Sequence, residues 1–356
     1  MILSRSVALL DALALVAPGR PLRDGVDRIL QADMGALIII GDGPDVLNIC
    51  SGGFLLDAAF SPQRLSELAK MDGAIILASD ASRIARANVH LVPDPNVPTS
   101  ETGTRHRTAE RVARSIDVPV IAVSEDQRVI SVYRRDEKHP IMSTARLLDR
   151  SNQALQTLQR YRDRLDREAA ELSTLEIEDV VTLRDVVDLL QLTETMVRIS
   201  TELDADIIEL GVDGRLVDLQ VGELMAGVEN LRRLVVSDYV TDEESRDNPL
   251  HVLGGMRDAD LVDDQVVAGR LGLPMGSDDL DQPLTPRGYR LLSQIPRLPW
   301  PVVERSVQTF GDIQKVMRAT VAELIEVGGL TESQAVVIKD GLRRLAEVTI
   351  LRQHSA

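Results

Sequence analysis

The stretch KMDGAIILASD, from Lys70 to Asp80, decides how the first part of this 356-residue chain folds. Its apolar centre, Ile75 to Ala78, has the length and composition of a buried strand. A strand of continuous apolar residues is typical of a sheet that is covered on both faces. Because Asp72 directly precedes this strand, we expect an aspartate that is exposed enough to meet a ligand and fixed enough to be aimed at it.

The sequence around this stretch alternates helical and strand patterns as far as about residue 143. Further strands are predicted at Ala36–Ile40, Ala87–Val92, Val118–Val123, Val129–Tyr133 and His139–Met142. Helices are predicted at Ser6–Val16, at Pro21–Ala32 and from Ser61 to about Lys70, where a capping serine precedes a first-turn proline. The pattern predicts an α/β domain with a mixed sheet flanked by helices.

A second motif, GTRHRT at Gly103–Thr108, is predicted to lead into a helix over Thr108–Ser115. Glycine lets the backbone approach a ligand, threonine supplies hydroxyls near the free N–H groups of a helix start, and two arginines flank His106. Such groups suit an anion, above all phosphate. Taken separately, an Asp-Gly pair is more often a turn than a site, and an Arg-His-Arg run is more often a solvated charged face.

Composition narrows the classes of function. The formal net charge of −16 argues against a surface that coats nucleic acid or membrane non-specifically. Cys50 is the single cysteine, which excludes an intramolecular disulfide and suits a reducing cytoplasm. No apolar run of about 18 residues occurs, so no transmembrane helix is expected. The first twenty residues fit an amphipathic helix better than a signal peptide.

From about Ser143 onward, the sequence pattern predicts helices only. Leucines at seven-residue and three- or four-residue spacings predict a helix of about 30 residues with an apolar seam, which packs either within its own domain or between chains. Helices follow at Leu175–Ile199 and Val221–Asp238, and Gly211–Gly214 between them is a short hairpin or a helix break. The stretch Asp238–Gln282 has a net charge of −9. It is predicted to be a solvated linker with one or two short helices rather than a metal cluster, because its aspartate spacing matches no calcium loop.

Residues 286–356 carry a net charge of +3, so the other 285 residues carry −19. The segments Leu292–Pro299 and Val327–Leu330 each precede a helical pattern, and they look like the hairpins of two helix–hairpin–helix units. Hairpin N–H groups and the positive end of the next helix bind a backbone phosphate without reading bases. The residues expected to contact DNA are Arg297, Gly328, Gly329 and Leu330. The alternative is that these helices only pack against each other, and the first hairpin has Pro-Arg-Leu-Pro where a glycine is usual.

The DGA of Asp72–Ala74 followed by the GTRHR of Gly103–Arg107 resembles the diadenylate cyclase family, and the chain from Pro21 to Leu345 resembles its DisA branch of DNA integrity scanning proteins. The resemblance implies an α/β cyclase domain at 1–143, an all-α linker and oligomerisation domain at 144–285, and a helix–hairpin–helix DNA-binding domain at 286–356. It also implies a cytoplasmic enzyme that condenses two ATP molecules into cyclic di-AMP and two pyrophosphates with Mg²⁺ or Mn²⁺.

The same resemblance implies roles for individual residues. Asp72 would bind the divalent metal and face the ribose hydroxyl, and Leu91 would give backbone hydrogen bonds to adenine. Gly73 and Ala74 would let the backbone approach the nucleotide. The residues expected to hold the phosphates are Gly103, Thr104, Arg105, His106, Arg107, Thr108 and Ser124. His106 is expected to be neutral, because two flanking arginines disfavour its protonation, and to orient or hydrogen-bond phosphate rather than act as an acid.

One DGA and one GTRHR per chain imply that two cyclase domains meet, each bringing one ATP, around a two-fold axis. The family forms octamers, and branched DNA bound at the helix–hairpin–helix ends could lower the activity. A competing hypothesis is a structural DNA-binding or sensor protein whose nucleotide domain is catalytically silent. A P-loop ATPase is disfavoured because the sequence contains no G-x-x-x-x-G-K-[ST].

Overall fold

The structure is a computed structural model and describes residues 5–240, 248–274 and 280–353. The chain divides into two compact units. The sheet unit comprises Ile2–Leu155 with Thr201–Val221, and the helical unit comprises Gln156–Ser200 with Gly222–Ala356. Among the described helices, none combines the length and the apolar character needed to cross a membrane.

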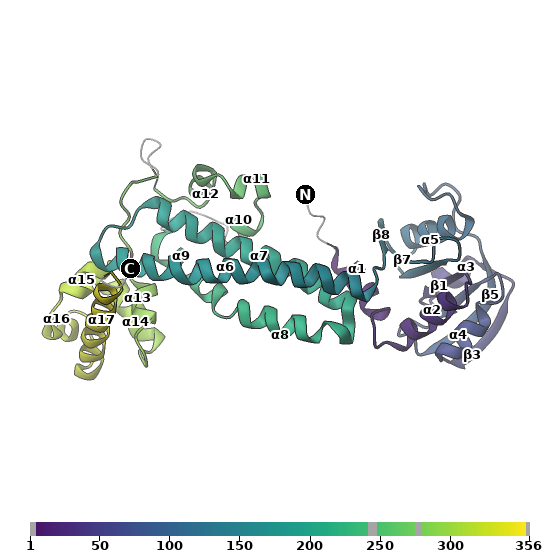
Figure 1. The fold of residues 1–356 in the computed structure, drawn as a ribbon, viewed down its shortest axis with the longest axis horizontal. Helices are drawn as coiled ribbons and strands as arrows, with labels where there is room; N and C mark the ends of the chain where they lie inside the picture. The colour runs from purple at the N-terminus through teal and green to yellow at the C-terminus, as the bar shows by residue number, and fades with distance from the viewer. Residues whose placement is uncertain (1–4, 241–247, 275–279, 354–356) are drawn as a thin grey trace. The chain divides into compact units, whose positions relative to one another are not determined.

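A mixed eight-stranded sheet forms the centre of the sheet unit (Figure 1). Its strands are β1 (Ala36–Ile40), β2 (Cys50–Ser51), β3 (Phe54–Ala59), β4 (Ala74–Leu77), β5 (Arg83–Leu91), β6 (Val120–Ser124), β7 (Val129–Arg134) and β8 (Glu137–Pro140). They lie in the order β2-β5-β4-β1-β6-β7-β8, with β3 also paired to β5. Strands β1 and β4 are parallel, and the other pairs are antiparallel. The prediction of a mixed sheet flanked by helices is confirmed.

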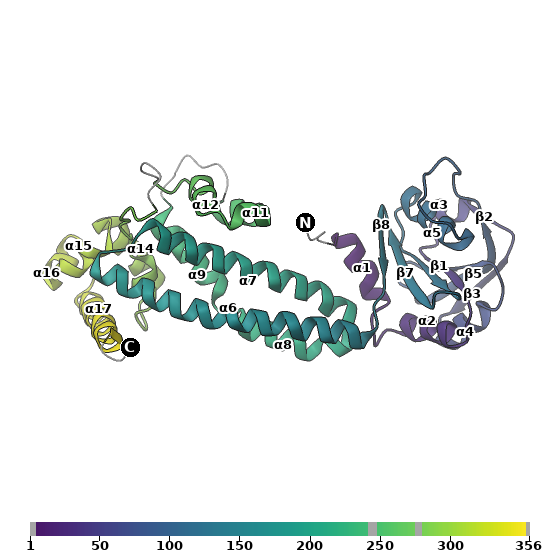
Figure 2. The same ribbon diagram turned by 45° about the horizontal axis from the view of Figure 1, so that its top comes forward.

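Helices cover both faces of this sheet, as the continuous apolar strands predict (Figure 1, Figure 2). The helices are α1 (Val7–Leu15), α2 (Pro21–Gln31), α3 (Pro44–Asn48), α4 (Pro62–Leu68) and α5 (Thr104–Ser115). One core joins α1, α2 and α4 to the face that includes Ile38 and Ile75. The other joins α3 and α5 to the face that includes Leu37 and Ile76. As a result β1 and β4 are buried at every residue.

Strand β3 was not predicted, and it differs from the buried strands. It pairs with β5, yet Phe54 is 55% exposed and Leu55 is 73% exposed. Two glycines with positive φ, Gly52 and Gly53, precede it. A Cβ on Gly53 would lie 2.7 Å from the carbonyl oxygen of Ala87, so glycine is needed where this strand approaches β5.

The sheet unit also includes residues from beyond position 143. Glu209 in the last turn of α7 accepts from Nε2 of His139 at 2.9 Å and from the N–H of Met142 at 3.1 Å. Asp206 pairs with Arg150 at 2.6 Å and with Arg5 at 3.5 Å. Two buried carboxylates therefore tie the C-terminal end of α7 to the segment that follows β8.

Long helices dominate the middle of the chain: α6 (Thr144–Glu178), α7 (Leu183–Leu210), α8 (Arg215–Leu224) and α9 (Val228–Tyr239). The predicted long helix is confirmed, with 35 residues in α6. Its seam residues Leu158, Leu165 and Leu172 are buried within this one chain, which favours packing inside the domain. Gly211–Gly214 is a short 3-10 helix, so the glycine-rich segment is a helix break and not a hairpin.

The acidic stretch is more ordered than the sequence predicts. It contains α10 (Pro249–Gly254), α11 (Asp258–Leu261) and α12 (Asp264–Arg270), while 241–247 and 275–279 lie outside the described residues. Leu253 and Val267 are fully buried. Arg198 of α7 donates to Asp258 at 2.6 Å and to the carbonyl of Met256 at 2.7 Å. The prediction of a solvated linker is wrong here, because apolar residues between the acids are buried and Arg198 of α7 holds the segment by hydrogen bonds.

Five helices form the C-terminal part of the helical unit: α13 (Tyr289–Ser293), α14 (Trp300–Phe310), α15 (Ile313–Arg318), α16 (Val321–Glu326) and α17 (Glu332–Gln353). They share one apolar core. The two predicted hairpins are the turns between α13 and α14 and between α16 and α17. Arg297 in the first turn has a φ of +64°, and Gly329 in the second has a φ of +61°, so both turns reach the left-handed conformation that glycine favours.

A buried cluster of charged groups joins α6, α9 and α13 in the helical unit. Arg290 donates through Nε and Nη2 to the two oxygens of Glu176 at 3.0 and 2.6 Å, and Tyr239 donates to Glu176 at 2.7 Å. Asp238 accepts from the N–H groups of residues 288–290 at 2.6 to 2.9 Å. Burial, together with the charge of Glu176, raises the pKa of Asp238 to about 7. We call these four side chains the buried cluster.

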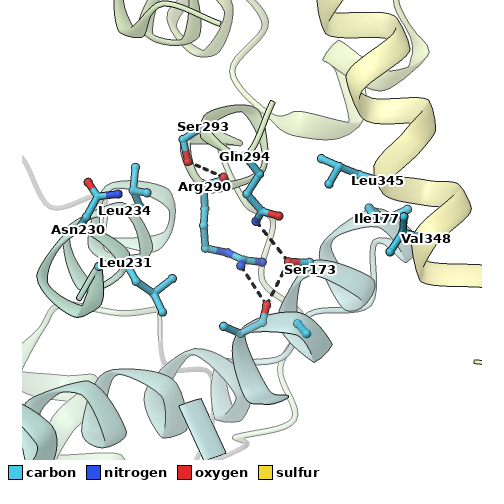
Figure 3. Close-up of a pocket in the computed structure, with 13 residues that line it drawn as sticks. Ser173, Ile177, Asn230, Leu231, Leu234, Arg290, Ser293, Gln294, Leu345 and Val348 are labelled. Atoms are coloured by element: carbon cyan, nitrogen blue, oxygen red, sulfur yellow. Dashed lines mark hydrogen bonds between the residues drawn. The ribbon is translucent and has the colours of Figure 1, made fainter. Parts of the chain in front are cut away.

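A pocket of about 450 Å³ adjoins this cluster, lined by α6, α9, α13 and α17 (Figure 3). Arg290 lies on its wall and donates through Nη1 to the carbonyl of Ala169 at 3.1 Å, and Gln294 donates to the hydroxyl of Ser173 at 3.3 Å. These polar groups are thus hydrogen-bonded within the protein. The lining includes none of the residues that the sequence assigns to the nucleotide or to DNA.

Candidate active site

Strand register brings several of the predicted residues to one edge of the sheet. Ile38 of β1 lies opposite Ile75 of β4, and Gly35 and Asp72 each come three residues before this pair on the two parallel strands. Ala36 lies opposite Val123 of β6, so the antiparallel register places Gly35 opposite Ser124. The residues just before β1 and β4 and the last residue of β6 therefore lie side by side. We call this the site edge.

Leu91, the last residue of β5, extends the site edge on the other side of β4. Val92 donates its N–H to the carbonyl of Ile49 at 2.8 Å, so these two residues form a hydrogen-bonded pair. Pairs alternate along an antiparallel ladder, which makes the neighbouring Leu91–Cys50 pair a non-bonded one. The N–H and carbonyl of Leu91 therefore point away from β2 and toward the side where Asp72 precedes β4. This direction suits the backbone contact predicted for Leu91.

Asp72 and Arg105 meet at the site edge. Nη2 of Arg105 lies 3.7 Å from Oδ1 of Asp72, whose side chain is fully exposed. The guanidinium lies over Gly35, where a Cβ would be only 2.0 Å from Nη1. Gly35 therefore leaves the space that Arg105 occupies. The two predicted motifs are brought together through this one pair.

Helix α5 begins earlier than predicted, at Thr104 instead of Thr108. The first helical hydrogen bond runs from the N–H of Arg107 to the carbonyl of Gly103 at 2.8 Å, which makes Gly103 the N-cap. The N–H groups of Thr104, Arg105 and His106 are therefore free of helical partners. No acidic residue occupies this turn, and no side chain caps it. The GTRHR motif is itself the helix N-terminus, with a positive dipole end and two arginines that suit an anion.

His106 follows Arg105 in α5 and lies about 100° farther round the helix. Its Nδ1 lies 2.9 Å from Oη of Tyr133 on β7. Tyr133 donates to Glu101 at 3.0 Å, and Lys138 on β8 donates to the same carboxylate oxygen at 2.6 Å. Burial lowers the pKa of His106, and Lys138 and Arg105 lower it further against the opposing charge of Glu101. The histidine is thus neutral near pH 7, with burial the leading cause and not the arginines alone.

The other predicted phosphate residues differ in what they offer. Arg107 is exposed. The hydroxyl of Thr108 donates to the carbonyl of Thr104 at 3.0 Å, so its proton is engaged within α5. The hydroxyl of Ser124 accepts the N–H of Gln127 at 3.3 Å and keeps its own proton to donate at the site edge.

Gly73 and Ala74 have a structural reason to be small. A Cβ on Gly73 would lie 2.3 to 2.4 Å from backbone atoms of Asn88 on β5. Asn88 has a φ of +53°, and the register between β4 and β5 shifts just past Ala74, so the two backbones approach closely at this irregularity. Ala74 is buried in the core on the α5 face. The small residues of the DGA motif therefore pack the strand that aims Asp72.

A divalent metal fits the site edge only together with a ligand. Within the residues that the structure covers, no three His, Cys, Asp or Glu side chains are grouped so that they could hold a metal ion. Mg²⁺ is commonly bound by one or two carboxylates with substrate phosphates completing its shell. A single exposed carboxylate, Asp72, fits a metal ion that arrives with a nucleotide and does not fit a resident ion held by protein alone.

Sequence reasoning missed four residues of this region: Gly35, Glu101, Arg128 and Tyr133. Arg128 follows Ser124 in the β6–β7 turn and pairs with Asp33 at 3.2 Å, adding a cation near the site edge. Glu101 lies just before the GTRHR motif, and an acidic residue so close to this basic motif was the one signal in the sequence that could have identified it. Gly35 and Tyr133 act through contacts with α5 that are distant in sequence, which no local pattern reveals.

The turns expected to contact DNA have fewer free groups than predicted. In the second turn, the N–H of Gly328 donates to Glu323 and that of Leu330 donates to Leu324. Arg305 donates to the carbonyl of Gly329 at 3.0 Å. Leu330 is buried in the C-terminal core. The first turn contains no glycine, and Arg297 provides a positively charged side chain there. Any phosphate contact in this region therefore depends more on arginine side chains than on bared hairpin N–H groups.

Two family profiles match the chain. One, described as DisA bacterial checkpoint controller nucleotide-binding, matches residues 23–138, and the other, described as DisA bacterial checkpoint controller linker region, matches residues 141–280. The chain is 50% identical over 345 residues to the DNA integrity scanning protein DisA of Frankia casuarinae, covering 96% of each chain. It is 50% identical to that of Kineococcus radiotolerans over 97% of each chain, and 47% identical to that of Streptomyces coelicolor over 96% of this chain and 93% of the relative.

Proposed function

The chain belongs to the DisA family, and from this membership we propose that it is a diadenylate cyclase, which condenses two ATP molecules into cyclic di-AMP and two pyrophosphates. The site edge supports this proposal most directly. It places one carboxylate, one guanidinium and the free N–H groups of a helix N-terminus within a single region of the sheet. These are the groups that a reaction at a phosphate requires for alignment and charge stabilisation.

In the proposed complex, each residue acts on one part of ATP. The first turn of α5 and Arg105 bind the phosphates, and the backbone of Leu91 meets the adenine edge. Asp72 faces the ribose hydroxyl and would hold the divalent ion, Mg²⁺ or Mn²⁺, which offsets phosphate charge when it is bound. Arg105 and Asp72 lie 3.7 Å apart, so the groups proposed for the phosphates and for the metal are already neighbours before ATP arrives.

The reaction requires two copies of the site edge. Each chain has one Asp72 and one GTRHR motif, and the hydroxyl of each ATP must attack the α-phosphorus of the other. Two sheet units facing each other across a two-fold axis satisfy this geometry. We propose that the chain forms a homo-oligomer built from such pairs, an octamer as expected for the family.

The experiment that tests this function is a product analysis. The purified protein is incubated with ATP and Mg²⁺ or Mn²⁺, and the products are separated by chromatography and identified by mass. Cyclic di-AMP with pyrophosphate is the expected result, and Asp72→Asn should reduce its formation at least about 100-fold while ATP binding partly survives. Formation of ADP alone, or of no product with either metal, would contradict the cyclase function and favour a DNA-binding protein whose nucleotide domain is catalytically silent.

We further propose that the C-terminal helices bind branched DNA and that bound DNA lowers the cyclase rate. The support is the positive charge of residues 286–356 in an otherwise acidic chain, together with the two glycine-like turns at Arg297 and Gly329. A four-way DNA junction should bind in a salt-dependent manner and reduce cyclic di-AMP formation. Tight binding with an unchanged rate would contradict the coupling, and Arg297→Ala should weaken binding without changing the rate in the absence of DNA.

A further inference from the structure

The first turn of the C-terminal helices ends at an exposed tryptophan. Trp300, the single tryptophan of the chain, begins α14 three residues after Arg297 and is 43% exposed. The other aromatic residues that the structure describes in the helical unit are buried or half-buried: Tyr161, Tyr239, Tyr289 and Phe310. A large aromatic ring gains free energy when it is covered, so an exposed ring at a turn proposed to contact DNA indicates a surface for a ligand.

The ring of Trp300 is held in place from one side by Tyr289. The two ring centroids lie 5.7 Å apart and the ring planes differ by 23°, so the rings are stacked. Tyr289 packs against the C-terminal core, and its N–H donates to Asp238 of the buried cluster at 2.6 Å. The tryptophan therefore rests on a fixed aromatic support, and a ligand that covers it meets a preorganised surface.

Exposed cations border the same ring. Cζ of Arg233 on α9 lies 6.0 Å from the Trp300 centroid, at the outer limit of cation–π attraction, so its guanidinium is not closely stacked on the ring. Arg233 and Arg297 are both exposed, and the structure gives neither of them an ion pair among its described residues. Glu304 is the single acidic residue in the sequence between Pro286 and Gly311. The surroundings of the ring are therefore positively charged.

From this arrangement we propose that Trp300 is a stacking platform for an unpaired base of branched DNA, with Arg233 and Arg297 meeting the phosphates of the same strand. Single-stranded nucleic acid is bound elsewhere by this combination of an aromatic face with cations along the backbone. The proposal rests on the proposed binding of branched DNA, and it adds a contact to a base where the hairpin turns contact only phosphate.

Stacking on Trp300 gives a physical reason for selecting branch points. In a continuous duplex both faces of each base are covered by its neighbours, so a protein ring finds no base to stack on. Bases at a branch point that lack a partner expose a face. Phosphate contacts bind any DNA backbone, whereas the platform adds affinity only where a base is unpaired. The alternative is that Trp300 only packs on Tyr289 to close the first turn, in which case the bases of the DNA make no difference.

The first test uses the intrinsic fluorescence of the full-length chain, because all tryptophan emission comes from Trp300. The probe is a three-way DNA junction with unpaired adenines at its branch point. The matched control has abasic residues at the same positions, which keep the phosphates and lack the bases. Binding of the first junction should quench the emission, and the abasic junction should bind roughly 5- to 150-fold more weakly without quenching. Equal Kd values and equal emission with the two junctions would overturn the proposal.

The second test compares variants on the same two junctions. Trp300→Ala should bind both with nearly equal Kd, whereas Trp300→Phe, which keeps an aromatic face, should retain most of the preference. Val327→Ala removes an exposed apolar side chain from the second turn and should leave the preference unchanged. A partial loss of folded protein in any variant affects both junctions alike, so the ratio of the two Kd values remains informative. A preference that survives in Trp300→Ala would overturn the proposal.

Salt dependence separates the stacking contact from the phosphate contacts. Arg297→Ala should weaken both junctions alike and lower the slope of log Kd against log salt by about 1, whereas Trp300→Ala should leave this slope unchanged. A slope that falls equally in the two variants would mean that Trp300 acts through phosphate, and would overturn the stacking role. Failure of the wild type to bind either junction would overturn the proposed DNA binding itself, whereas tight and equal binding of both would overturn only the platform.

Discussion

Charged side chains are used differently at the site edge and in the buried cluster. Asp72 is fully exposed and faces Arg105 across 3.7 Å, whereas Arg290 and Glu176 are 2% and 1% exposed and meet at 2.6 Å. An exposed, loosely held pair adds little to folding and remains free to bind a ligand. A buried pair is satisfied by the protein, and removing one partner leaves an unpaired charge out of water. Mutations at the site edge should therefore change ligand binding, and mutations in the buried cluster should change stability.

The largest effect is expected for Arg290→Ala. It leaves the charge of Glu176 buried without its bidentate partner, which should lower the free energy of unfolding of the helical unit by about 3–5 kcal/mol. Denaturant titration measures this change. Arg343→Ala is the matched control, because its ion pair with Asp340 is at the surface and its removal should cost less than about 0.5 kcal/mol. Equal effects of the two substitutions would remove the distinction between buried and exposed pairs.

The second largest effect is expected for the change in the free energy of unfolding with pH that the buried cluster causes. Because the pKa of Asp238 is raised to about 7 in the folded protein, the folded state holds this proton more tightly than the unfolded chain. Its contribution to stability is then full below about pH 4 and is lost as the pH rises through about 7, a change on the order of 1–4 kcal/mol. Denaturant unfolding of the helical unit across this range measures the slope. Asp238→Asn should flatten it, and an unchanged slope in that variant would place the titration elsewhere.

At the site edge, Arg105→Ala should weaken ATP binding by roughly 10- to 100-fold, since a charge-assisted hydrogen bond contributes about 1.5–3 kcal/mol. The free energy of unfolding should change by less than about 0.5 kcal/mol. Arg107→Ala should have the smaller effect on ATP affinity, because Arg105 lies beside Asp72 at the site edge, whereas Arg107 is exposed and the structure gives it no ion pair among its described residues. Calorimetric titration with ATP measures both, and the reverse order would mean that the wrong arginine has been assigned to the site edge.

The smallest effect is expected for Gly35→Ala. Its Cβ would displace the guanidinium of Arg105 from the space above Gly35, and this flexible end can move without disturbing the strand. We expect ATP affinity to fall about three- to tenfold, less than for removal of the arginine. Gly43→Ala, where a Cβ meets no atom within 4 Å, is the matched control and should leave the affinity unchanged. A loss equal to that of Arg105→Ala would mean that Gly35 also contacts the nucleotide.

The local sequence was sufficient to predict those elements whose structure is determined by a single segment of the chain. Strand β1 at Ala36–Ile40 was predicted to the residue, because a run of five apolar residues closed by Gly41 admits few alternatives. Helix α2 begins at Pro21 as predicted, since proline at the first helical position fixes the start. The DGA and GTRHR motifs could be found in the sequence because each is contiguous.

Partners that are distant in sequence could not be predicted. The surroundings of His106 depend on Tyr133 and Lys138, which lie 27 and 32 residues away and come near it only through the order of β7 and β8 in the sheet. Strand β3 was missed because exposed apolar residues do not follow the alternation that marks a half-buried strand. The start of α5 was placed too late, since no capping side chain marks Gly103 as its N-cap.

The two carboxylates at the end of α7 determine which segments can be exchanged between related chains to build a chimera. Glu209 and Asp206 contact His139, Met142 and Arg150 across about sixty residues of sequence. A chimera joined at residue 143 would therefore combine the strands of one parent with the carboxylates of another. Recombination that respects this interface must transfer 201–221 along with the N-terminal part, so the inherited module is discontinuous in the gene although it is contiguous in space.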